Sequence, residues 1–588
     1  TTIITYKMKK TLLFSVALAG LMLGSCSSSD DLNGGGNNTG SNQSGDGYVA
    51  FTINMPSLSG SSSRAFDSSN DQFKDGLAKE YAVKDATLLL FDGADENSAT
   101  FVAAYKLSTE PWKNLAPSDD NITTQSRKIV QKVTKSINKA KALVILNKNG
   151  IFTVDDSDNS LTVNRTKFTG TFKDFLEKAN ATDGKDFTKE GFYMANAPLA
   201  SSIGGATAPA TGTKVTTLTD LTGKIYDSEL AAQTGNPAEV YVERGVAKVT
   251  LQKATVDKAD NGTPTKVPFE VTGWAIDNYN PTTYLVRSTD GFNSWMNYAN
   301  ENVTAKPYRF VGHTEVAPGL YRTYFAKDVN YDTDASTVLK RATDFKNTYG
   351  DENPQYCFEN TFNVEKQREN QTTLATIKAK LNDGTSFYIL GGDQTTLYTE
   401  DDLKTLVAGK FITEEETWLK TNGKAGEKIE TTDITVTLDK TNPTAVTVTD
   451  IKVADSKLTA PTTVTYPALD NVKAAIGTIT YYQNGESYYT VRIKHFGDEL
   501  TPWAKDQLGV SENSIYPDGT KTAENNWLGR YGVLRNNWYD ITVEGVKGLG
   551  SPIRPDLTPT TDDELESYIA VRINVLSWAK RTQGATLH

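Results

Sequence analysis

The chain contains few of the residues on which most enzymes and disulfide-stabilised proteins depend. Its 588 residues include three histidines and two cysteines, Cys26 and Cys357. It has no His-Glu-x-x-His zinc motif, no Gly-x-Ser-x-Gly nucleophile turn and no phosphate-binding glycine loop. These absences argue against metalloproteases, serine hydrolases and nucleotide-dependent enzymes. The sequence therefore predicts a protein that is not an enzyme and has no cofactor and no metal.

Three remaining candidates for chemistry each have a simpler interpretation. His495 stands at the end of a predicted strand beside Phe496, where a structural role is favoured over catalysis. Cys357 has no recognisable base near it in the sequence, so a buried and inert thiol is expected. The acidic run 155–159 lacks the glycine and the glutamate spacing of an EF-hand loop, which favours a solvated turn over a calcium site.

The chain also lacks an excess of positive charge and a long apolar segment. The net charge is -11, so no basic stripe is available to bind phosphates and no nucleic-acid partner is expected. No segment reaches the roughly 18 consecutive apolar residues of a transmembrane helix. The hydrophobic content of 38% is enough for sizeable cores, and the length indicates more than one domain.

The first 26 residues have the order of a lipoprotein export signal. Basic residues at 9–10 precede an apolar run at 12–23, and small residues then lead to Cys26. This order predicts export and lipidation of Cys26, with Met8 as the translation start. If Cys26 carries lipid, Cys357 has no partner for an intrachain disulfide. Residues 27–47 are mostly Ser, Gly, Asn and Asp, which predicts a flexible tether outside the membrane.

Apolar and polar residues alternate with period two along most of the chain, which is typical of strands with one buried face. The predicted strands are rich in Val, Ile, Thr and Tyr. They span residues 48–56, 86–91, 142–146, 238–251, 434–438, 444–451, 487–493, 539–546 and 567–578. Helical patterns are fewer, at 171–179 and 399–408, with a weaker one at 335–348. The pattern predicts an all-β fold with few short helices, built as β-sandwiches.

Short motifs lie in a fixed order along the chain, at 481–485, 488–496, 531–539 and 546–552, with further ones at 242–249, 273–278, 357–361 and 575–578. Together they resemble the motifs of the Bacteroidales fimbrilins, most closely the minor fimbrial shaft subunits of the Porphyromonas type. The resemblance runs from the leader to the C-terminus, and it depends on the order and spacing of the motifs together. It implies two transthyretin-like β-sandwich domains in tandem, and a fimbrium at the cell surface and outer membrane that supports adhesion.

The motif residues themselves are expected to shape the fold. Asn536, Asn537 and the glycine-rich segment 548–552 have the chemistry of turns that flank a strand. Trp274 and Trp578 are predicted to be core anchors, because a buried indole removes a large apolar area from water.

The first predicted strand has one apolar face, so it can fill a strand position in the first sandwich. The residues of this face are Val49, Phe51, Ile53 and Met55. Arg64 follows in a Ser-rich loop, directly before Ala65. Alone it would be an ordinary exposed basic residue, but its place after a removable strand favours a processing site. The resemblance implies that an arginine-specific surface protease cuts after Arg64 and thereby removes the strand.

An empty strand position is an open template for another chain. The resemblance implies donor-strand exchange, in which a C-terminal segment of the next subunit enters the position, and this head-to-tail contact builds a filament. The candidate donor residues are Ile569, Val571, Ile573 and Val575. The tail 579–588 is the alternative donor. A cleavage site together with a C-terminal donor favours a shaft subunit, with tip and anchor subunits as further partners.

The predicted organisation is therefore a lipoprotein signal at 1–26, a tether and removable strand at 27–64, an N-terminal sandwich at 65–237 and a C-terminal sandwich at 238–588. The small-residue stretch 200–219 precedes the boundary and is predicted to be a loop or linker. The alternative function is a monomeric surface lipoprotein that binds glycans or host proteins through exposed aromatic residues. Such a monomer would keep its first strand. No residue identifies a receptor.

Overall fold

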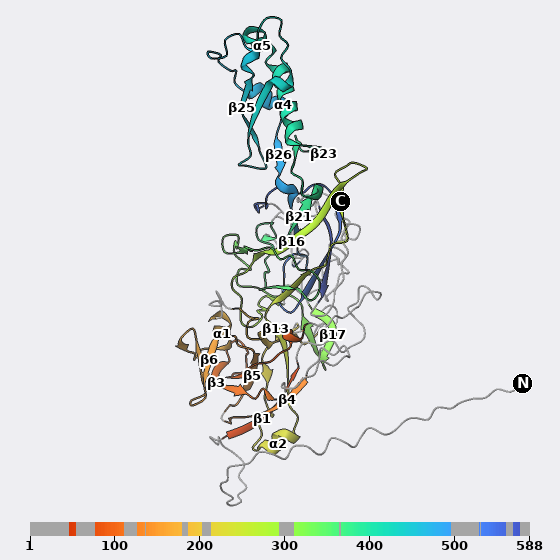
Figure 1. Cartoon of the computed structure of the whole chain (residues 1–588). Helices are drawn as coiled ribbons and strands as arrows, with labels where there is room; N and C mark the ends of the chain where they lie inside the picture. The colour runs from red at the N-terminus through yellow and green to blue at the C-terminus, as the bar shows by residue number, and fades with distance from the viewer. Residues whose placement is uncertain are drawn as a thin grey trace, which may run out of the picture. The chain divides into compact units, whose positions relative to one another are not determined.

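The structure is a computed structural model of the chain (Figure 1). It describes residues 46–54, 77–110, 126–135, 137–178, 186–202, 213–292, 311–363, 366–495, 529, 531–559 and 569–576. The chain divides into two units, Thr1–Ser44 and Gly45–His588, and all the described residues lie in the second.

The all-β fold class with few short helices is confirmed. The largest sheet has eight strands in the order β3-β2-β5-β9-β13-β1-β4, with β12 paired to β5. Its strands are β1 (Asp46–Asn54), β2 (Ala86–Asp92), β3 (Thr100–Leu107), β4 (Ser126–Thr134), β5 (Ala140–Leu146), β9 (Met194–Asn196), β12 (Thr219–Asp220) and β13 (Ala238–Arg244). The tandem arrangement of two transthyretin-like sandwiches stays a prediction.

The other strands form smaller sheets. One has the order β11 (Val215–Thr216), β10 (Leu199–Ala200), β18 (Leu320–Thr323) and β17 (Val311–Ala317). Another has the order β20 (Gln355–Cys357), β14 (Ala247–Leu251), β28 (Trp538–Val546) and β29 (Ile569–Leu576). A third runs from β15 (Lys258–Ala259) through β16 (Val267–Tyr279) and β21 (Leu374–Leu381) to β27 (Glu486–Arg492), with β19 (Lys340–Arg341) paired to β16.

Three short sheets complete the set among the described residues: β23 (Asp393–Tyr398), β22 (Phe387–Leu390) and β26 (Ile479–Tyr482); β24 (Ile434–Asp439) and β25 (Thr447–Val453); and β6 (Phe152–Asp155), β7 (Ser160–Val163) and β8 (Thr166–Lys167). The helices are α1 (Phe172–Lys178), α2 (Glu229–Thr234), α4 (Glu400–Glu414), α5 (Glu416–Asn422) and α6 (Asp470–Ile476). None of these described helices has the length and hydropathy needed to cross a membrane.

Buried apolar side chains gather in separate clusters. The first includes residues of β1, β2, β5 and β13, and the second includes residues of β14, β16, β21 and β28. A further cluster, which the sequence did not predict as a separate core, is built by α4, α6, β24 and β25. The domain boundary near residue 237 stays a prediction. Directly after it, β13 lies in the eight-stranded sheet and contributes Val240 and Val242 to the first cluster.

The predicted elements agree with the structure except at three places. The expected helix 335–348 is wrong, because Lys340 and Arg341 pair with β16 as a short strand and Lys346 bridges Trp274 of the same strand. The expected strand 238–251 is two strands, β13 and β14, which pair with different neighbours. The expected linker 200–219 includes the short strand β11, which pairs with β10, and the first residue of β12.

A buried ion pair connects the short helical turn Ala78–Glu80 to β14 in the second cluster. The Nζ of Lys248 lies 3.0 Å from the Oε1 of Glu80, and both side chains are fully buried. The hydroxyl of Tyr356 donates a hydrogen bond to the same carboxylate, and the Nε of Arg244 donates one to the Glu80 carbonyl oxygen at 3.0 Å. Burial acts to raise the pKa of Glu80, but the charges of Lys248 and Arg244 outweigh it, so the pKa is lowered and the carboxyl is ionised.

A second buried charge network joins β13 to the turn before β28. The guanidinium of Arg287 donates hydrogen bonds to both oxygens of Glu243, at 2.9 and 2.7 Å. It also donates one to the carbonyl oxygen of Arg535, whose own guanidinium lies 3.4 Å from Glu359. Glu243, Glu359 and Arg535 belong to the motifs that resemble fimbrilins. The expectation that these motifs shape the fold is thus met by their buried contacts.

The turn and anchor predictions can be checked at three of the named residues. Asn536 has a positive φ of 61°, and the side chain of Asn537 donates hydrogen bonds to the carbonyl oxygens of Leu534 and Arg535. Trp274 is fully buried and donates its indole N–H to the carbonyl oxygen of Thr348. Trp578 lies outside the described residues.

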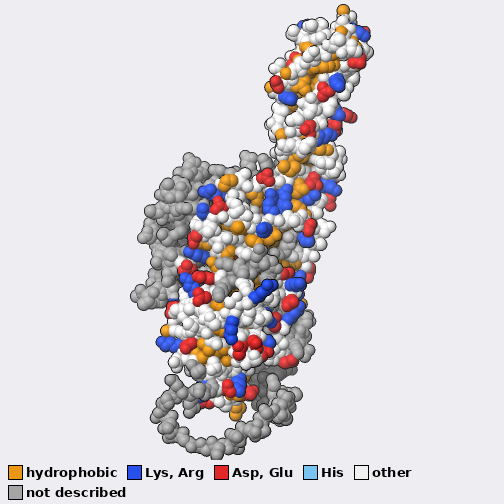
Figure 2. All heavy atoms as spheres, turned by 90° about the vertical axis from the view of Figure 1, so that its left-hand side faces the viewer, with side chains coloured by type: hydrophobic (Ala, Val, Ile, Leu, Met, Phe, Trp, Pro, Cys, Tyr) orange, Lys and Arg blue, Asp and Glu red, His pale blue; other side chains and the backbone are white. Residues whose placement is uncertain are grey.

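The molecular surface carries charges of both signs. Figure 2 shows Lys and Arg side chains interspersed with Asp and Glu over the face turned to the viewer. The described residues of this face therefore present no basic stripe of the kind that binds a phosphate backbone.

The buried pair at Glu80 gives a first prediction. Glu80→Gln would leave Lys248 and Arg244 buried without their counter-charge, so the free energy of unfolding should fall by about 3 kcal/mol. Urea unfolding of the whole chain measures this change. Glu416→Gln is the matched control, because Glu416 pairs with Lys420 at the surface and the change should stay within about 0.5 kcal/mol. Equal effects of the two substitutions would contradict the proposed importance of the buried pair.

Candidate functional site

The strand β1 lies between two neighbours in the eight-stranded sheet (Figure 1). All nine of its residues pair with β4 in antiparallel register, from Asp46 opposite Thr134 to Asn54 opposite Ser126. On its other side it pairs with β13 in parallel register, over Phe51 to Asn54 only. We call the position between β13 and β4 the strand slot.

The side chains of β1 are buried in the first cluster. Val49, Phe51 and Ile53 are fully buried, as the alternation in the sequence predicted, and Ala50 is 1% exposed. Burial of each of these three apolar side chains stabilises the fold by roughly 1.5–3 kcal/mol. Met55, the fourth residue of the predicted apolar face, lies outside the described residues. The strand thus contributes to the core as well as to the sheet.

A second segment covers the half of β1 that β13 does not reach. The N–H and carbonyl groups of Tyr48 exchange two hydrogen bonds of 2.8 Å with those of Tyr226. Tyr226 leads into α2, which begins after Ser228, whose hydroxyl accepts a hydrogen bond from the N–H of Ala231. We call residues 225–235 the clasp.

The clasp is also attached to β4, on the opposite side of β1. The ammonium of Lys128 donates a hydrogen bond of 2.6 Å to the carbonyl oxygen of Gln233, and Lys135 forms an ion pair with Asp227. The clasp therefore bridges from the β13 side of the slot to β4.

Exposed polar contacts lie at both ends of β1. Lys132 of β4 lies 2.6 Å from Asp46, and its hydrogen bond with this carboxylate raises the pKa of Lys132. At the other end, the side-chain amide of Asn54 donates a hydrogen bond of 2.8 Å to Glu239. Exposed contacts of this kind stabilise little, so burial and backbone pairing hold the strand.

The other predicted site residues are placed differently. Cys26, Arg64 and Ala65 lie outside the described residues. The candidate donor residues Ile569, Val571, Ile573 and Val575 lie in β29, which pairs with β28 of the same chain in antiparallel register. β29 ends the path of its four-stranded sheet, so among the described strands β28 is its hydrogen-bonded neighbour there. Whether this strand or the tail is a donor stays a prediction.

The residues considered for chemistry have structural contacts. His495 is buried, with Nδ1 at 2.8 Å from the Tyr539 hydroxyl and Nε2 at 3.0 Å from the Tyr324 carbonyl oxygen. Burial raises the pKa of Cys357 to about 12, so this thiol stays protonated. Asp158 pairs with Lys167, which lowers its pKa to about 2. No group of three or more His, Cys, Asp or Glu side chains in the described residues is arranged to hold a metal.

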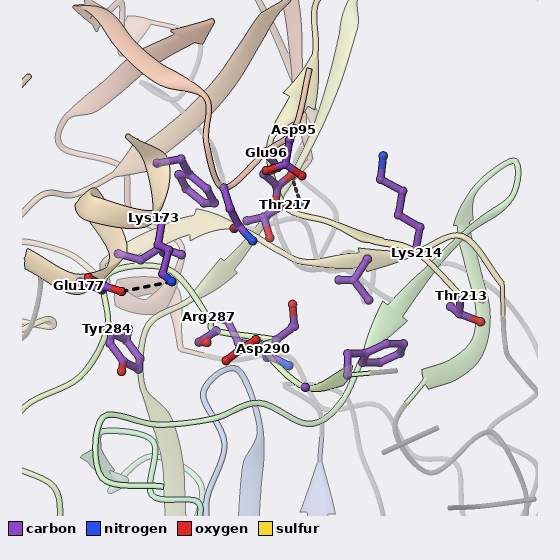
Figure 3. Close-up of a pocket in the computed structure, with 18 residues that line it drawn as sticks. Asp95, Glu96, Lys173, Glu177, Thr213, Lys214, Thr217, Tyr284, Arg287 and Asp290 are labelled. Carbon is purple, nitrogen blue, oxygen red and sulfur yellow. Dashed lines mark hydrogen bonds and ion pairs between the residues drawn. The ribbon is translucent and has the colours of Figure 1, made fainter. Parts of the chain in front are cut away.

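A polar cavity of about 710 Å³ lies between the β2–β3 turn, α1, β11 and residues 284–292 (Figure 3). Several of its charged groups have protein partners. The carboxylate of Glu96 accepts hydrogen bonds of 2.8 Å from the N–H groups of Thr217 and Leu218, and Lys173 lies 3.9 Å from Glu177. Burial raises the pKa of Glu96.

Residues 515–584 match the model of a family described as "Major fimbrial subunit protein type IV, Fimbrillin, C-terminal". The resemblance to fimbrilins is confirmed over this region. The fimbrillin region includes β28 and β29, and it supports a fimbrial subunit role for the chain.

Several solved structures are similar over most of the chain. A cell adhesion protein from Parabacteroides distasonis has 11% identity and a TM-score of 0.33, with 92% of this chain and 98% of that chain covered. A fimbrilin from Porphyromonas gingivalis has 12% identity and a TM-score of 0.31, with 90% of this chain and 97% of that chain covered. The tip fimbrial protein Mfa3 from P. gingivalis has 9% identity and a TM-score of 0.27, with 90% of this chain and 99% of that chain covered. At these TM-scores the likeness carries no functional argument. No curated protein sequence matches the chain.

Sequence reasoning identified β1 but missed the residues around it. The alternation of apolar residues shows which side chains a strand buries, but it does not show which strands lie beside it. The clasp could not be predicted because its helix has six residues, too few for a recognisable periodic pattern. Ser228 followed by Glu229 was the available signal for a helix start.

The slot gives a second prediction. Phe51→Ala in the uncleaved chain removes a fully buried ring and should lower the free energy of unfolding by about 3–5 kcal/mol. Thr52→Ala on the same strand is the control, and it should cost less than about 1 kcal/mol because this side chain is only partly buried. Urea unfolding compares the two. Similar losses in both variants would show that β1 is not a core strand.

Proposed function

We propose that the chain is the shaft subunit of a cell-surface fimbria, polymerised by exchange of the strand in the slot. It is exported as a lipoprotein precursor through Cys26, reaches the outer membrane and cell surface, and is cleaved after Arg64 by an arginine-specific protease. The next subunit then supplies a strand to the empty slot. The subunit is structural and not an enzyme, and the filament supports adhesion.

The observation that supports this proposal most is the position of β1. It is an interior strand of the largest sheet, yet it precedes Arg64 in the chain, so one cut separates it from everything that follows. Its loss would expose the backbone groups of β4 along nine positions and those of β13 along four. It would also empty the space filled by Val49, Phe51 and Ile53. Such an edge binds an extended segment through main-chain hydrogen bonds and alternating side chains.

The donor is proposed to lie in residues 569–588. If β29 is the donor, its departure breaks its pairing with one strand, β28, because β29 stands at the end of the strand order. If the tail 579–588 is the donor, β29 stays in place and anchors it. Either segment joins one subunit to the next in the same direction, which gives an open filament. Tip and anchor subunits would occupy its two ends.

Cleavage-dependent assembly is the third prediction. The chain from Cys26 onward should stay a monomer until it is cut after Arg64, and should then form ladders and filaments. Size-exclusion chromatography and electron microscopy measure this change. Arg64→Ala should remain monomeric under the same protease.

A deletion of residues 569–588 should still be cleaved but should not polymerise, which separates processing from donation. Persistence of a monomer in the cleaved, full-length protein would overturn the proposal. It would favour the monomeric lipoprotein that binds glycans or host proteins.

A further inference from the structure

Gly47 occupies a crowded position of β1. A Cβ atom built on Gly47 would lie 2.4 Å from the Cγ2 of Ile225, and it would also contact Lys135 and the Tyr226 carbonyl oxygen. Gly47 is buried in the strand and is not among the described residues with positive φ. Its backbone is therefore open to any residue, and only the space beside Ile225 requires a glycine.

Ile225 is partly buried and packs against the first cluster. The next residue, Tyr226, exchanges two backbone hydrogen bonds with Tyr48, and its ring packs so closely on Gly235 that a Cβ there would lie 2.4 Å from the Tyr226 hydroxyl oxygen. Lys128 of β4 and Lys135, which directly follows β4, add exposed polar contacts to the clasp. Branching at Cβ restricts χ1, which limits how far the Ile225 side chain can turn aside.

We propose that Ile225 is a register gauge for the slot: it admits glycine at the position of Gly47, disfavours serine because a Cβ atom there already lies 2.4 Å from its Cγ2, and disfavours the bulkier β-branched residues most. This inference rests on the proposed function, because it applies to the strand that replaces β1 as well as to β1. It assigns a specificity-determining role to a residue of the clasp.

Alternation alone does not fix the register of a strand in this slot. A slip of one residue exchanges the buried and exposed faces and is disfavoured, but a slip of two residues keeps every apolar side chain on the buried face. For β1, a two-residue slip in one direction brings Val49 against Ile225. The opposite slip puts Gly47 where Val49 is buried and leaves that space empty. The gauge excludes the first error and the apolar filling excludes the second.

The same rule ranks registers of the candidate donor. The apolar alternation from Ile569 to Val575 is bracketed by Ser567 and Ser577, each two residues beyond its end. When three of its apolar residues fill the spaces of Val49, Phe51 and Ile53, the gauge position receives either one of these serines or a β-branched residue of the strand itself, in both chain directions. Ile225 would disfavour the registers that place serine there less than those that place a β-branched residue there.

The test uses fluorescent peptides with the sequence of residues 46–54 and the full chain cleaved after Arg64. Fluorescence anisotropy should show that the native peptide binds, that its Gly47→Ser form binds somewhat more weakly, and that its Gly47→Val form binds at least tenfold more weakly. The Ile225→Ala chain should bind the Gly47→Val peptide nearly as tightly as the unchanged chain binds the native peptide. Leu230→Ala is the matched control, since this exposed residue of the clasp should not change the ranking.

A second measurement keeps the gauge testable if no peptide enters the cleaved chain, a result that would count against strand exchange itself. In the uncleaved chain, Gly47→Val should lower the melting temperature by about 5 °C, and adding Ile225→Ala should restore most of it. Equal binding of the glycine and valine peptides, or no restoration by Ile225→Ala in the uncleaved chain, would overturn the gauge.

Discussion

The eight-stranded sheet is continuous only while a strand lies between β13 and β4. This strand is β1, and its burial makes it part of the first apolar cluster rather than an appended edge. The chain's own strand fills the slot, and in the proposed strand exchange it leaves before another strand enters. Under that proposal, the stability of the monomer and its capacity to assemble depend on one set of backbone hydrogen bonds.

The sequence predicted the features that depend on neighbouring residues. Alternation located β1, with Val49, Phe51 and Ile53 on its buried side, and the helical pattern at 399–408 coincides with the first part of α4. Features that depend on contacts between residues far apart in the chain could not be predicted. Residues 335–348 have an apolar spacing that suits a helix, but pairing with β16 holds Lys340 and Arg341 extended. The clasp lies about 180 positions from β1 in the chain, and no local pattern could reveal that Ile225 faces Gly47.

The residues that resemble fimbrilins are instructive because many of them are charged and buried. Glu243, Glu359 and Arg535 lie in one hydrogen-bonded network, and Lys248 pairs with Glu80 in another. A charge removed from water is tolerated only when its partners are placed correctly, so each such residue constrains several segments at once. This explains why the motifs depend on order and spacing rather than on a catalytic cluster. It also explains how the chain holds its parts together without an intrachain disulfide among the described residues.

The unequal pairing of β1 has a mechanical meaning. A strand in the slot that is pulled along its own axis loads its hydrogen bonds to β4 and β13 in shear, so many bonds must break together rather than one after another. The parallel partner β13 runs on to Glu243 and Arg244, whose side chains enter the buried polar contacts with Arg287 and with the Glu80 carbonyl group. Tension on a strand in the slot would therefore reach the interior of the subunit through β13.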